Sequence, residues 1–317
     1  MSIRSQTAPR LDPAKFQDAT VTLKGERRAT VSLAALKTLW FNTGTLCNIT
    51  CANCYIDSSP RNDALVYLGA AEVREYLDEA HDLPLEQVGF TGGEPFMNPD
   101  LVPMLDDVLS RGLEALVLTN AMQPMRRYAN ALTALRDRHG VSRLIIRVSL
   151  DHHDAAVHDI ERGPGSFART LEGLAWLARE GFVIHVAGRA GFGAEDEGAM
   201  RAAYAALFAL HSIPVDAQDS VALMLFPEMD AERDVPEITE ACWGILKKSP
   251  ESMMCASSRM VVKRKGAAKP AVLACTLLAY DARFELGATL AEASRPVALN
   301  HAHCATFCVL GGAACSR

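Results

Sequence analysis

The feature that most constrains this chain is a group of three cysteines, Cys47, Cys51 and Cys54, spaced C-x3-C-x2-C with no fourth cysteine nearby. Cysteine thiolates ligate iron–sulfur clusters, so three of them can hold three irons of a [4Fe–4S] cubane and leave the fourth iron without a protein ligand. In other catalytic metal sites an open position receives a substrate or cofactor. The spacing therefore favours cluster chemistry over simple electron carriage. A zinc site is the alternative interpretation of the same residues.

Downstream of these cysteines, apolar strand-like segments alternate with segments of helical periodicity. The expected strands are Leu39–Asn42, Gln87–Thr91, Ala115–Thr119, Leu144–Leu150, Val183–Ala187 and Val221–Phe226. The expected helices between them are Ala70–His81, Leu101–Arg111, Arg126–Arg138, Phe167–Glu180 and Ala199–His211. Strands separated by helices form parallel β/α units. The count predicts an α/β fold with a partial (β/α)6 barrel of the TIM type, and a doubly wound sheet is the competing architecture.

Polar and glycine-rich residues follow the ends of the expected strands. They include Gly92-Gly93-Glu94, Asn120 and Asp151. In β/α barrels the active site lies at the carboxyl ends of the strands, so we expect these residues to meet at one mouth. Glycines without side chains would let the backbone approach a ligand there.

The cysteine run and Thr91-Gly92-Gly93-Glu94-Pro95 together resemble the signature motifs of the radical S-adenosylmethionine (radical SAM) superfamily. The resemblance implies a [4Fe–4S] cluster on Cys47, Cys51 and Cys54 and SAM bound to its open iron. It also implies reductive cleavage of SAM to a 5′-deoxyadenosyl radical. The residues that the resemblance places around SAM are Tyr55, Gly92, Gly93, Glu94, Asn120, Ser149, Asp151 and Arg162.

Several of these positions have expected roles within the resemblance. Glu94 would accept hydrogen bonds from the methionine amino group, Ser149 and Asp151 would contact the ribose, and Arg162 would face the SAM carboxylate. A helix N-cap at Asn120 and a solvated turn at Arg162 are the alternatives.

The cysteine loop departs from the family at one position. Relatives often have an aromatic residue directly before the third cysteine, where this chain has Asn53, so Tyr55 is expected to supply the aromatic surface. Arg189, at the next strand end, is a weaker candidate for a site residue.

A second set of cysteines follows the expected barrel. Cys255 and Cys275 flank an expected hairpin of Arg259–Val262 and Ala271–Cys275, after an expected helix at Ile238–Leu246. The remaining members of the set are Cys304, Cys308 and Cys315. Their order resembles the family's Twitch extension, the shortened form of the SPASM extension, which binds one auxiliary [4Fe–4S] cluster. Four cysteines would close that site, with Cys315 able to replace one of the others, and zinc is again the alternative. His301 and His303 are expected to be exposed.

Composition limits the partners and the cellular compartment expected for the protein. The 317 residues carry a formal net charge of −6, which argues against a nucleic-acid partner. No apolar run has the roughly 18 residues needed to span a bilayer, and the start of the chain lacks the apolar core of a signal peptide. Nine cysteines in such a chain favour metal ligation in a reducing cytoplasm over disulfides.

These observations predict three segments: an N-terminal arm over 1–37, a radical SAM partial barrel over 38–235, and a Twitch-like extension over 236–317. The expected function is hydrogen abstraction from a substrate that is oxidised or rearranged, with a flavodoxin- or ferredoxin-type protein as electron donor. A small-molecule substrate is favoured because the short arm leaves no room for a peptide-recognition domain. A peptide or protein side chain is the alternative substrate, and a non-catalytic iron–sulfur carrier or redox sensor is the alternative of another class. No side chain stands out as catalytic.

Overall fold

The computed structural model describes residues 9–190, 196–227, 230 and 232–312. Its centre is a run of six parallel strands that are hydrogen-bonded in chain order. The strands are β2 (Thr38–Asn42), β3 (Gln87–Thr91), β4 (Glu114–Thr119), β5 (Leu144–Ser149), β6 (Val183–Arg189) and β7 (Leu223–Phe226). A doubly wound sheet would reverse its strand order at a switch point. The unbroken order confirms the partial barrel.

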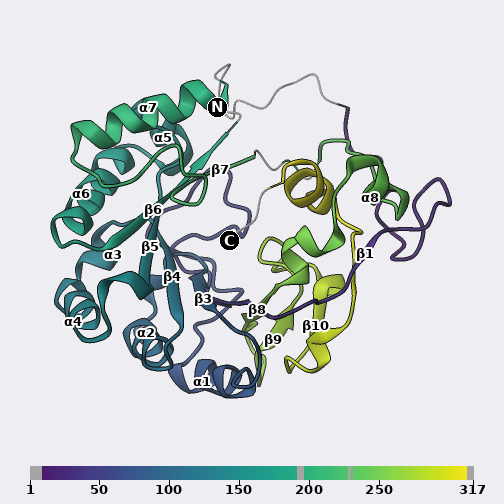
Figure 1. The fold of residues 1–317 in the computed structure, drawn as a ribbon, viewed down its shortest axis with the longest axis horizontal. Coiled ribbons are helices and arrows are strands. Elements are labelled where there is room, and N and C mark those ends of the chain that lie inside the picture. The colour runs from purple at the N-terminus through teal and green to yellow at the C-terminus, as the bar shows by residue number, and fades with distance from the viewer. Residues whose placement is uncertain (1–8, 191–195, 228–229, 231, 313–317) are drawn as a thin grey trace.

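Helices cover the outer side of these strands (Figure 1). They are α1 (Ala70–Glu79), α2 (Leu101–Ser110), α3 (Gln123–Arg126), α4 (Ala129–His139), α5 (Ala155–Arg162), α6 (Ser166–Arg179) and α7 (Glu197–Leu210). The expected helix Arg126–Arg138 is wrong at its start, because a separate turn, α3, ends at Arg126 and Tyr128 packs on Phe96 with ring centroids 6.2 Å apart. Helix α5 was not expected. Asp154 begins it by accepting hydrogen bonds from the N–H groups of Ala156 and Val157.

The C-terminal segment extends the same sheet. β8 (Ser258–Val262) and β9 (Ala271–Leu273) form the expected antiparallel hairpin, and β10 (Glu285–Gly287) adds a further strand. The sequence did not predict that β8 pairs in parallel with β2, which joins the hairpin to the barrel. α8 (Ala241–Leu246) is shorter than the helix expected there, and Cys304–Leu310 forms a π-helix, η7. The short 3-10 helices are Pro95–Met97, Val141–Arg143, Pro250–Ser252, Met254–Ala256, Ala282–Phe284 and Glu292–Ser294.

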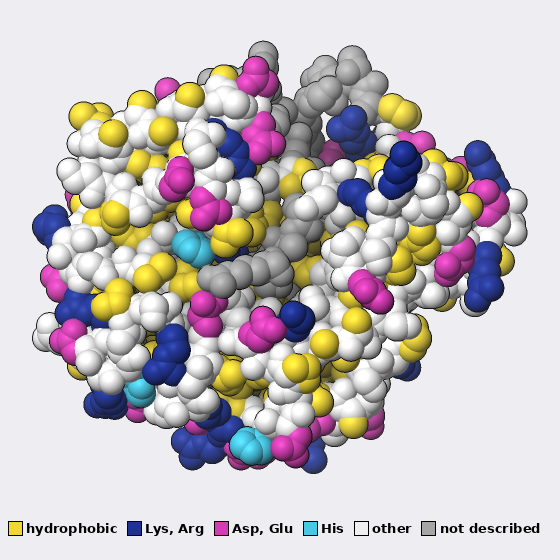
Figure 2. Space-filling view, viewed as in Figure 1, with side chains coloured by type: hydrophobic (Ala, Val, Ile, Leu, Met, Phe, Trp, Pro, Cys, Tyr) yellow, Lys and Arg dark blue, Asp and Glu magenta, His cyan; other side chains and the backbone are white. Residues whose placement is uncertain are grey.

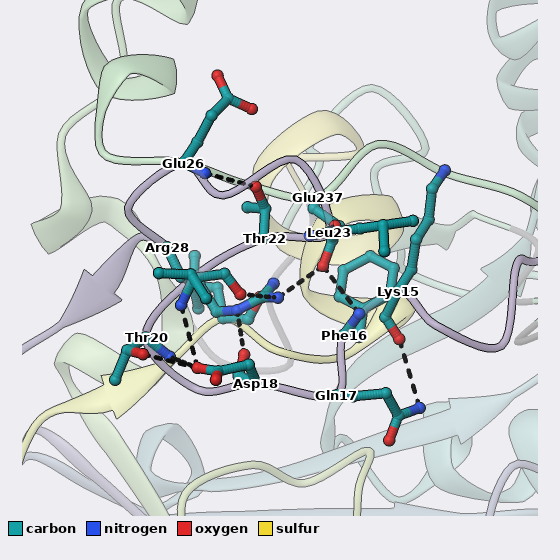
Figure 3. A network of polar contacts seen from close by, with 12 residues as sticks. Lys15, Phe16, Gln17, Asp18, Thr20, Thr22, Leu23, Glu26, Arg28 and Glu237 are labelled. Carbon is teal, nitrogen blue, oxygen red and sulfur yellow. Dashed lines mark hydrogen bonds and ion pairs between the residues drawn. The ribbon is translucent and has the colours of Figure 1, made fainter.

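The N-terminal arm crosses the C-terminal segment rather than the barrel. β1 (Thr30–Val31) pairs with β11 (Val297–Ala298). Arg28 is fully buried and pairs with Glu237, with 2.5 Å between Nη2 and Oε1, and Glu237 also accepts hydrogen bonds from the N–H groups of Phe16 (2.8 Å) and Leu23 (2.7 Å) (Figure 3). A buried charge pair thus connects chain segments about two hundred residues apart.

On the face shown in Figure 2, acidic and basic side chains are interspersed around the rim, so neither sign dominates that face. Within the described residues, no helix is both long enough and apolar enough to cross a membrane.

Candidate functional site

A cavity opens at the carboxyl ends of the parallel strands, and the three N-terminal cysteines lie on its wall. Of the eight residues expected around SAM, seven also line it: Tyr55, Gly92, Gly93, Asn120, Ser149, Asp151 and Arg162. Glu94 does not. The apolar part of the wall was not predicted from the sequence, and it includes Leu118, Ala187, Phe226 and Phe307. We call this space the first cavity.

Gly92 and Gly93 are required by a backbone-to-backbone contact with the segment that leads into the cysteine loop. Gly92 has φ +133°, and a Cβ there would lie 2.4 Å from the carbonyl oxygen of Gly44. A Cβ on Gly93 would lie 2.2 Å from the carbonyl oxygen of Leu46. The N–H of Gly93 donates to the Gly44 carbonyl at 2.8 Å. Only residues without side chains allow this approach, which holds the start of the cysteine loop against β3.

Glu94 lies behind the cavity wall, with 2% of its surface exposed. Its carboxylate accepts hydrogen bonds from the hydroxyl of Thr119 (2.8 Å) and from the N–H groups of Asn120 (2.9 Å) and Phe96 (3.2 Å). Burial raises the pKa of Glu94 to about 7, although these hydrogen bonds oppose the shift. In this structure the carboxylate therefore joins β3 to the end of β4.

Asn120 connects the end of β4 to the cysteine loop. Its Nδ2 donates to Oδ1 of Asn48, the neighbour of Cys47, at 2.8 Å. Its Oδ1 accepts from the N–H of Met122 at 3.1 Å, while Met122 is itself the N-cap of α3. Asn120 is thus not the helix cap that was the alternative interpretation.

Asp151 and Arg162 form a buried ion pair on the cavity wall. Arg162 donates from Nε (2.7 Å) and Nη2 (3.0 Å) to the two carboxylate oxygens. Burial alone would raise the pKa of Asp151, but the adjacent Arg162 guanidinium holds it below its usual range. Arg162 is the last residue of α5, so the solvated turn considered for it is wrong. Two side chains expected to contact SAM separately are paired with each other.

The departure at Asn53 is explained by a contact that the sequence did not reveal. The Asn53 amide donates to both carboxylate oxygens of Glu161, at 3.0 and 2.8 Å. Arg189 pairs with Glu161 at 3.3 Å and donates to the Asn53 carbonyl at 3.1 Å. This ring of three residues fixes the cysteine loop to α5 and β6. The N-cap signal at Asp154 could have placed Glu161 on a helix, but not against Asn53.

The first cavity fits a cluster with one open iron. It contains three cysteines, and no fourth described cysteine lies on its wall. Burial raises the pKa of Cys47 to about 12, so a thiolate there needs nearby positive charge such as iron provides. No three His, Cys, Asp or Glu side chains in the described ranges converge as ligands of a single metal ion.

A second cavity lies in the C-terminal segment and contains the second cysteine set. Cys255, Cys275, Cys304 and Cys308 line it together with His303 and apolar side chains. Burial, followed by the nearby Cys275 and Cys255, raises the pKa of Cys304 well above its usual value. None of the eight described cysteines forms a disulfide. The donor set fits a metal cluster held by four thiolates, and Cys315 lies outside the described residues.

The two tail histidines are not exposed as expected. His303 is buried on the wall of the second cavity, and its Nδ1 has no hydrogen-bond partner among the described residues. His301 is half-buried, and its ring packs edge-on against Phe284 and His303. The contact of His301 with Phe284 and the place of His303 on the cavity wall account for the difference.

The π-helix η7 separates the two cavities. Cys304 and Cys308 line the second cavity, while Phe307 between them lines the first. Phe307 stacks on Phe226 at the end of β7, with ring centroids 5.6 Å apart and 24° between the planes. The same helix therefore carries ligand candidates on one side and contributes to the wall of the first cavity on the other.

Comparison with known proteins agrees with this geometry. Residues 41–205, more than half of the chain, match the family model described as "Radical SAM superfamily". The antilisterial bacteriocin subtilosin biosynthesis protein AlbA of Bacillus subtilis is 30% identical over 169 residues, which are 53% of this chain and 35% of AlbA. The matched region thus spans about a third of that relative.

Solved structures share the fold. SuiB of Streptococcus suis bound to its precursor peptide SuiA has a TM-score of 0.58 at 12% identity, covering 81% of this chain and 63% of SuiB. The protein anSMEcpe with bound AdoMet also has a TM-score of 0.58, at 13% identity, covering 83% of this chain and 81% of that protein.

Proposed function

Because this chain belongs to the radical SAM superfamily, we propose that it binds a [4Fe–4S] cluster and SAM in the first cavity and removes a hydrogen atom from a substrate there. The observation that carries this proposal is the meeting of Cys47, Cys51 and Cys54 with Gly92 and Gly93 on one wall. When bound, the cluster and SAM supply a 5′-deoxyadenosyl radical, which takes the hydrogen atom.

The side chains around the cavity would position these groups. Cys47, Cys51 and Cys54 would each ligate an iron, and the backbone at Gly92-Gly93 would lie along the methionyl part of SAM. Ser149 and Asp151 would offer a hydroxyl and a carboxylate to the ribose, and Tyr55 an aromatic surface to the adenine. Glu94 would act mainly by holding β3 and β4 together, since protein donors occupy its oxygens.

The ion pair with Asp151 limits what Arg162 can do. A guanidinium has five N–H donors, and two of those on Arg162 bind Asp151. The remaining N–H donors leave Arg162 able to bind the SAM carboxylate while it stays paired with Asp151.

We propose that the second cavity holds an auxiliary [4Fe–4S] cluster on Cys255, Cys275, Cys304 and Cys308. Four thiolates would fill its protein ligand positions, so electron transfer suits it better than substrate ligation. Cys315 remains an alternative ligand. We keep the division of the chain at 37 and 235 as part of the proposal, although β8 joins the extension to the barrel sheet.

We propose a peptide or protein side chain as the substrate. AlbA is named for the biosynthesis of a bacteriocin, and the structure of SuiB, which shares the fold, contains a precursor peptide. These relatives favour the peptide over the small molecule that the short N-terminal arm suggested. The proposed electron donor is a flavodoxin- or ferredoxin-type protein, and the proposed compartment is a reducing cytoplasm.

The test begins with anaerobic reconstitution. Iron and sulfide analysis should give about eight irons per chain, four for each cubane, and about four in a Cys255→Ala/Cys304→Ala variant. Incubation with SAM and dithionite should yield 5′-deoxyadenosine, and a Cys47→Ala variant should yield none. Zinc without sulfide would contradict the proposal. Iron without SAM binding or 5′-deoxyadenosine would favour an iron–sulfur carrier or sensor.

A further inference from the structure

A third hollow, of about 650 Å³, lies between α3 and α6 on the outer side of the barrel. Figure 1 shows these two helices on the side of the sheet away from the C-terminal segment. Three arginines, Arg126, Arg169 and Arg179, line the hollow with a single acidic residue, Glu172. We call this surface the arginine hollow.

The three arginines line the same hollow and outnumber its one acidic residue. Arg169, Glu172, Trp176 and Arg179 follow each other at helical spacing along α6, and the Arg126 guanidinium lies over the Trp176 ring, 4.8 Å from its centroid. Arg169 donates to the backbone carbonyl of Pro164 at 3.2 Å. Among the residues that the structure describes, none of the three arginines forms an ion pair. In a chain with a net charge of −6, such a group marks a surface for an anionic partner.

The floor of the hollow touches the back of the cysteine loop. Met122 lines the hollow, and its sulfur lies 3.7 Å from Nδ2 of Asn48, the residue bonded to Cys47. Asn120 lines the first cavity, whereas Ala121 and Met122 line the hollow. A partner bound in the hollow would therefore come near Cys47 through Met122 and Asn48, on the side of the loop away from the first cavity. It would not enter the space proposed for SAM and substrate.

We propose that the arginine hollow docks a small acidic one-electron carrier protein, which reduces the cluster proposed at Cys47, Cys51 and Cys54. The inference rests on the proposed function. One electron passes from the reduced flavin or iron–sulfur centre of the carrier to the cluster, so the carrier is oxidised by one electron and the cluster is reduced by one. No bond is made or broken and no proton moves. The arginines attract and orient carboxylates of the carrier.

The position of the hollow favours this partner over an acidic segment of a peptide substrate. A substrate has to reach the first cavity, and the backbone of Asn120–Met122 separates that cavity from the hollow. An electron needs only proximity to a ligand of the cluster. The path from Met122 to Cys47 crosses one non-bonded contact and then follows the chain through Asn48.

The experiment uses reconstituted full-length protein and a purified acidic flavodoxin. An Arg169→Glu/Arg179→Glu variant is compared with an Arg27→Glu/Lys269→Glu control, which makes the same change in net charge at exposed positions of the N-terminal arm and the hairpin. Calorimetry measures flavodoxin binding, and stopped-flow absorbance measures cluster reduction by flavodoxin and, separately, by dithionite.

We expect the hollow variant to lose about tenfold or more in both binding and reduction rate at low salt, with the difference shrinking at high salt. Reduction by dithionite should be unchanged, and the control should match wild type. Equal losses in both variants, or none in either, would overturn the docking site.

Two further outcomes assign the hollow to other ligands. If the Arg169→Glu/Arg179→Glu variant binds an acidic peptide more weakly but is reduced by flavodoxin at the wild-type rate, the hollow is a peptide site. If inorganic phosphate alone displaces flavodoxin from the wild-type protein, the hollow is a simple anion site. Each outcome overturns the proposal. Cleavage of SAM with dithionite tests the proposed function independently. Calorimetry reports on docking even if no cluster forms.

Discussion

The ion pair between Arg28 and Glu237 allows a stability prediction that can be worked out from the structure. Substituting Glu237→Gln removes the negative charge and leaves the Arg28 guanidinium, whose side chain is 0% exposed, without its counter-charge. Breaking a buried pair by removing one partner costs about 3–5 kcal/mol. Arg28 keeps backbone carbonyl acceptors at Asp18 (2.6 Å) and Val21 (2.9 Å), so we expect the lower end, about 3 kcal/mol.

The effect should depend on pH in a defined direction. Burial alone would raise the pKa of Glu237, but the hydrogen bonds from Arg28, Leu23 and Phe16 hold it below the usual value. A carboxylate with a lowered folded-state pKa stabilises the protein above its unfolded pKa of about 4.3 and loses that contribution as the pH falls through the folded value. The difference in stability between wild type and Glu237→Gln should therefore be constant from pH 7 to about pH 5 and shrink below about pH 4.

The assay is urea unfolding, monitored by tryptophan fluorescence, of proteins in the same metal-loading state. Glu232→Gln is the matched control, because Glu232 pairs with Arg10 at a site where the side chains are 62% and 83% exposed. Such a surface pair is worth about 0–1 kcal/mol, so the control should hardly move the midpoint. Similar losses in the two variants, or a Glu237→Gln effect that grows as the pH falls below 4, would refute the reasoning.

Three further substitutions test the site and its supports. Gly93→Ala places a Cβ 2.2 Å from a carbonyl oxygen of the neighbouring loop, so we expect a lower iron content after reconstitution. Gly244→Ala, which meets no atom within 4 Å, is its control, and equal iron contents would contradict the argument. Glu161→Gln weakens the hold on Asn53, so a chelator should remove iron faster than from wild type, and an unchanged rate would exclude Glu161 as a positioning residue. Phe307→Ala deletes a ring that is 2% exposed and should cost about 3–5 kcal/mol of unfolding free energy, measured in urea; a loss below about 1 kcal/mol would mean that the stacked rings do not anchor the extension.

The sequence predicted the parts of the fold that depend on local pattern. The apolar run at Gln87–Thr91 became β3 with the expected bounds. The strand expected at Val221–Phe226 begins two residues later, at Leu223. Element type follows from periodicity and the run of apolar residues, and the order of strands follows because strands that are consecutive in the chain usually lie side by side. The family motifs added the expectation that the three N-terminal cysteines meet the Gly-Gly turn.

Contacts between distant segments could not be read from the sequence. Glu94 was expected to accept hydrogen bonds from the amino group of SAM, and the sequence did not indicate that its carboxylate also accepts a hydrogen bond from the Thr119 hydroxyl. Asn53 stands where relatives often have an aromatic residue, and the sequence did not indicate its partner Glu161, 108 positions along the chain. In both cases the partner is chosen by the packing of strands and helices that are remote in sequence. No local pattern carries that information.

The placement of the second cavity shows how the extension and the barrel act as one unit. β8 continues the barrel sheet beside β2, so the hairpin that precedes Cys275 cannot shift without disturbing the strand before the cysteine loop. At the opposite edge, η7 reaches the end of β7 through the stacked rings of Phe307 and Phe226. The second cavity is thus fixed to both edges of the parallel strands, and its cysteines are separated from the first cavity by one helix. A metal cluster bound to Cys304 and Cys308 would stabilise the helix that forms the wall of the reaction cavity, so loss of the auxiliary site would alter the shape of the site where substrate binds as well as its redox chemistry.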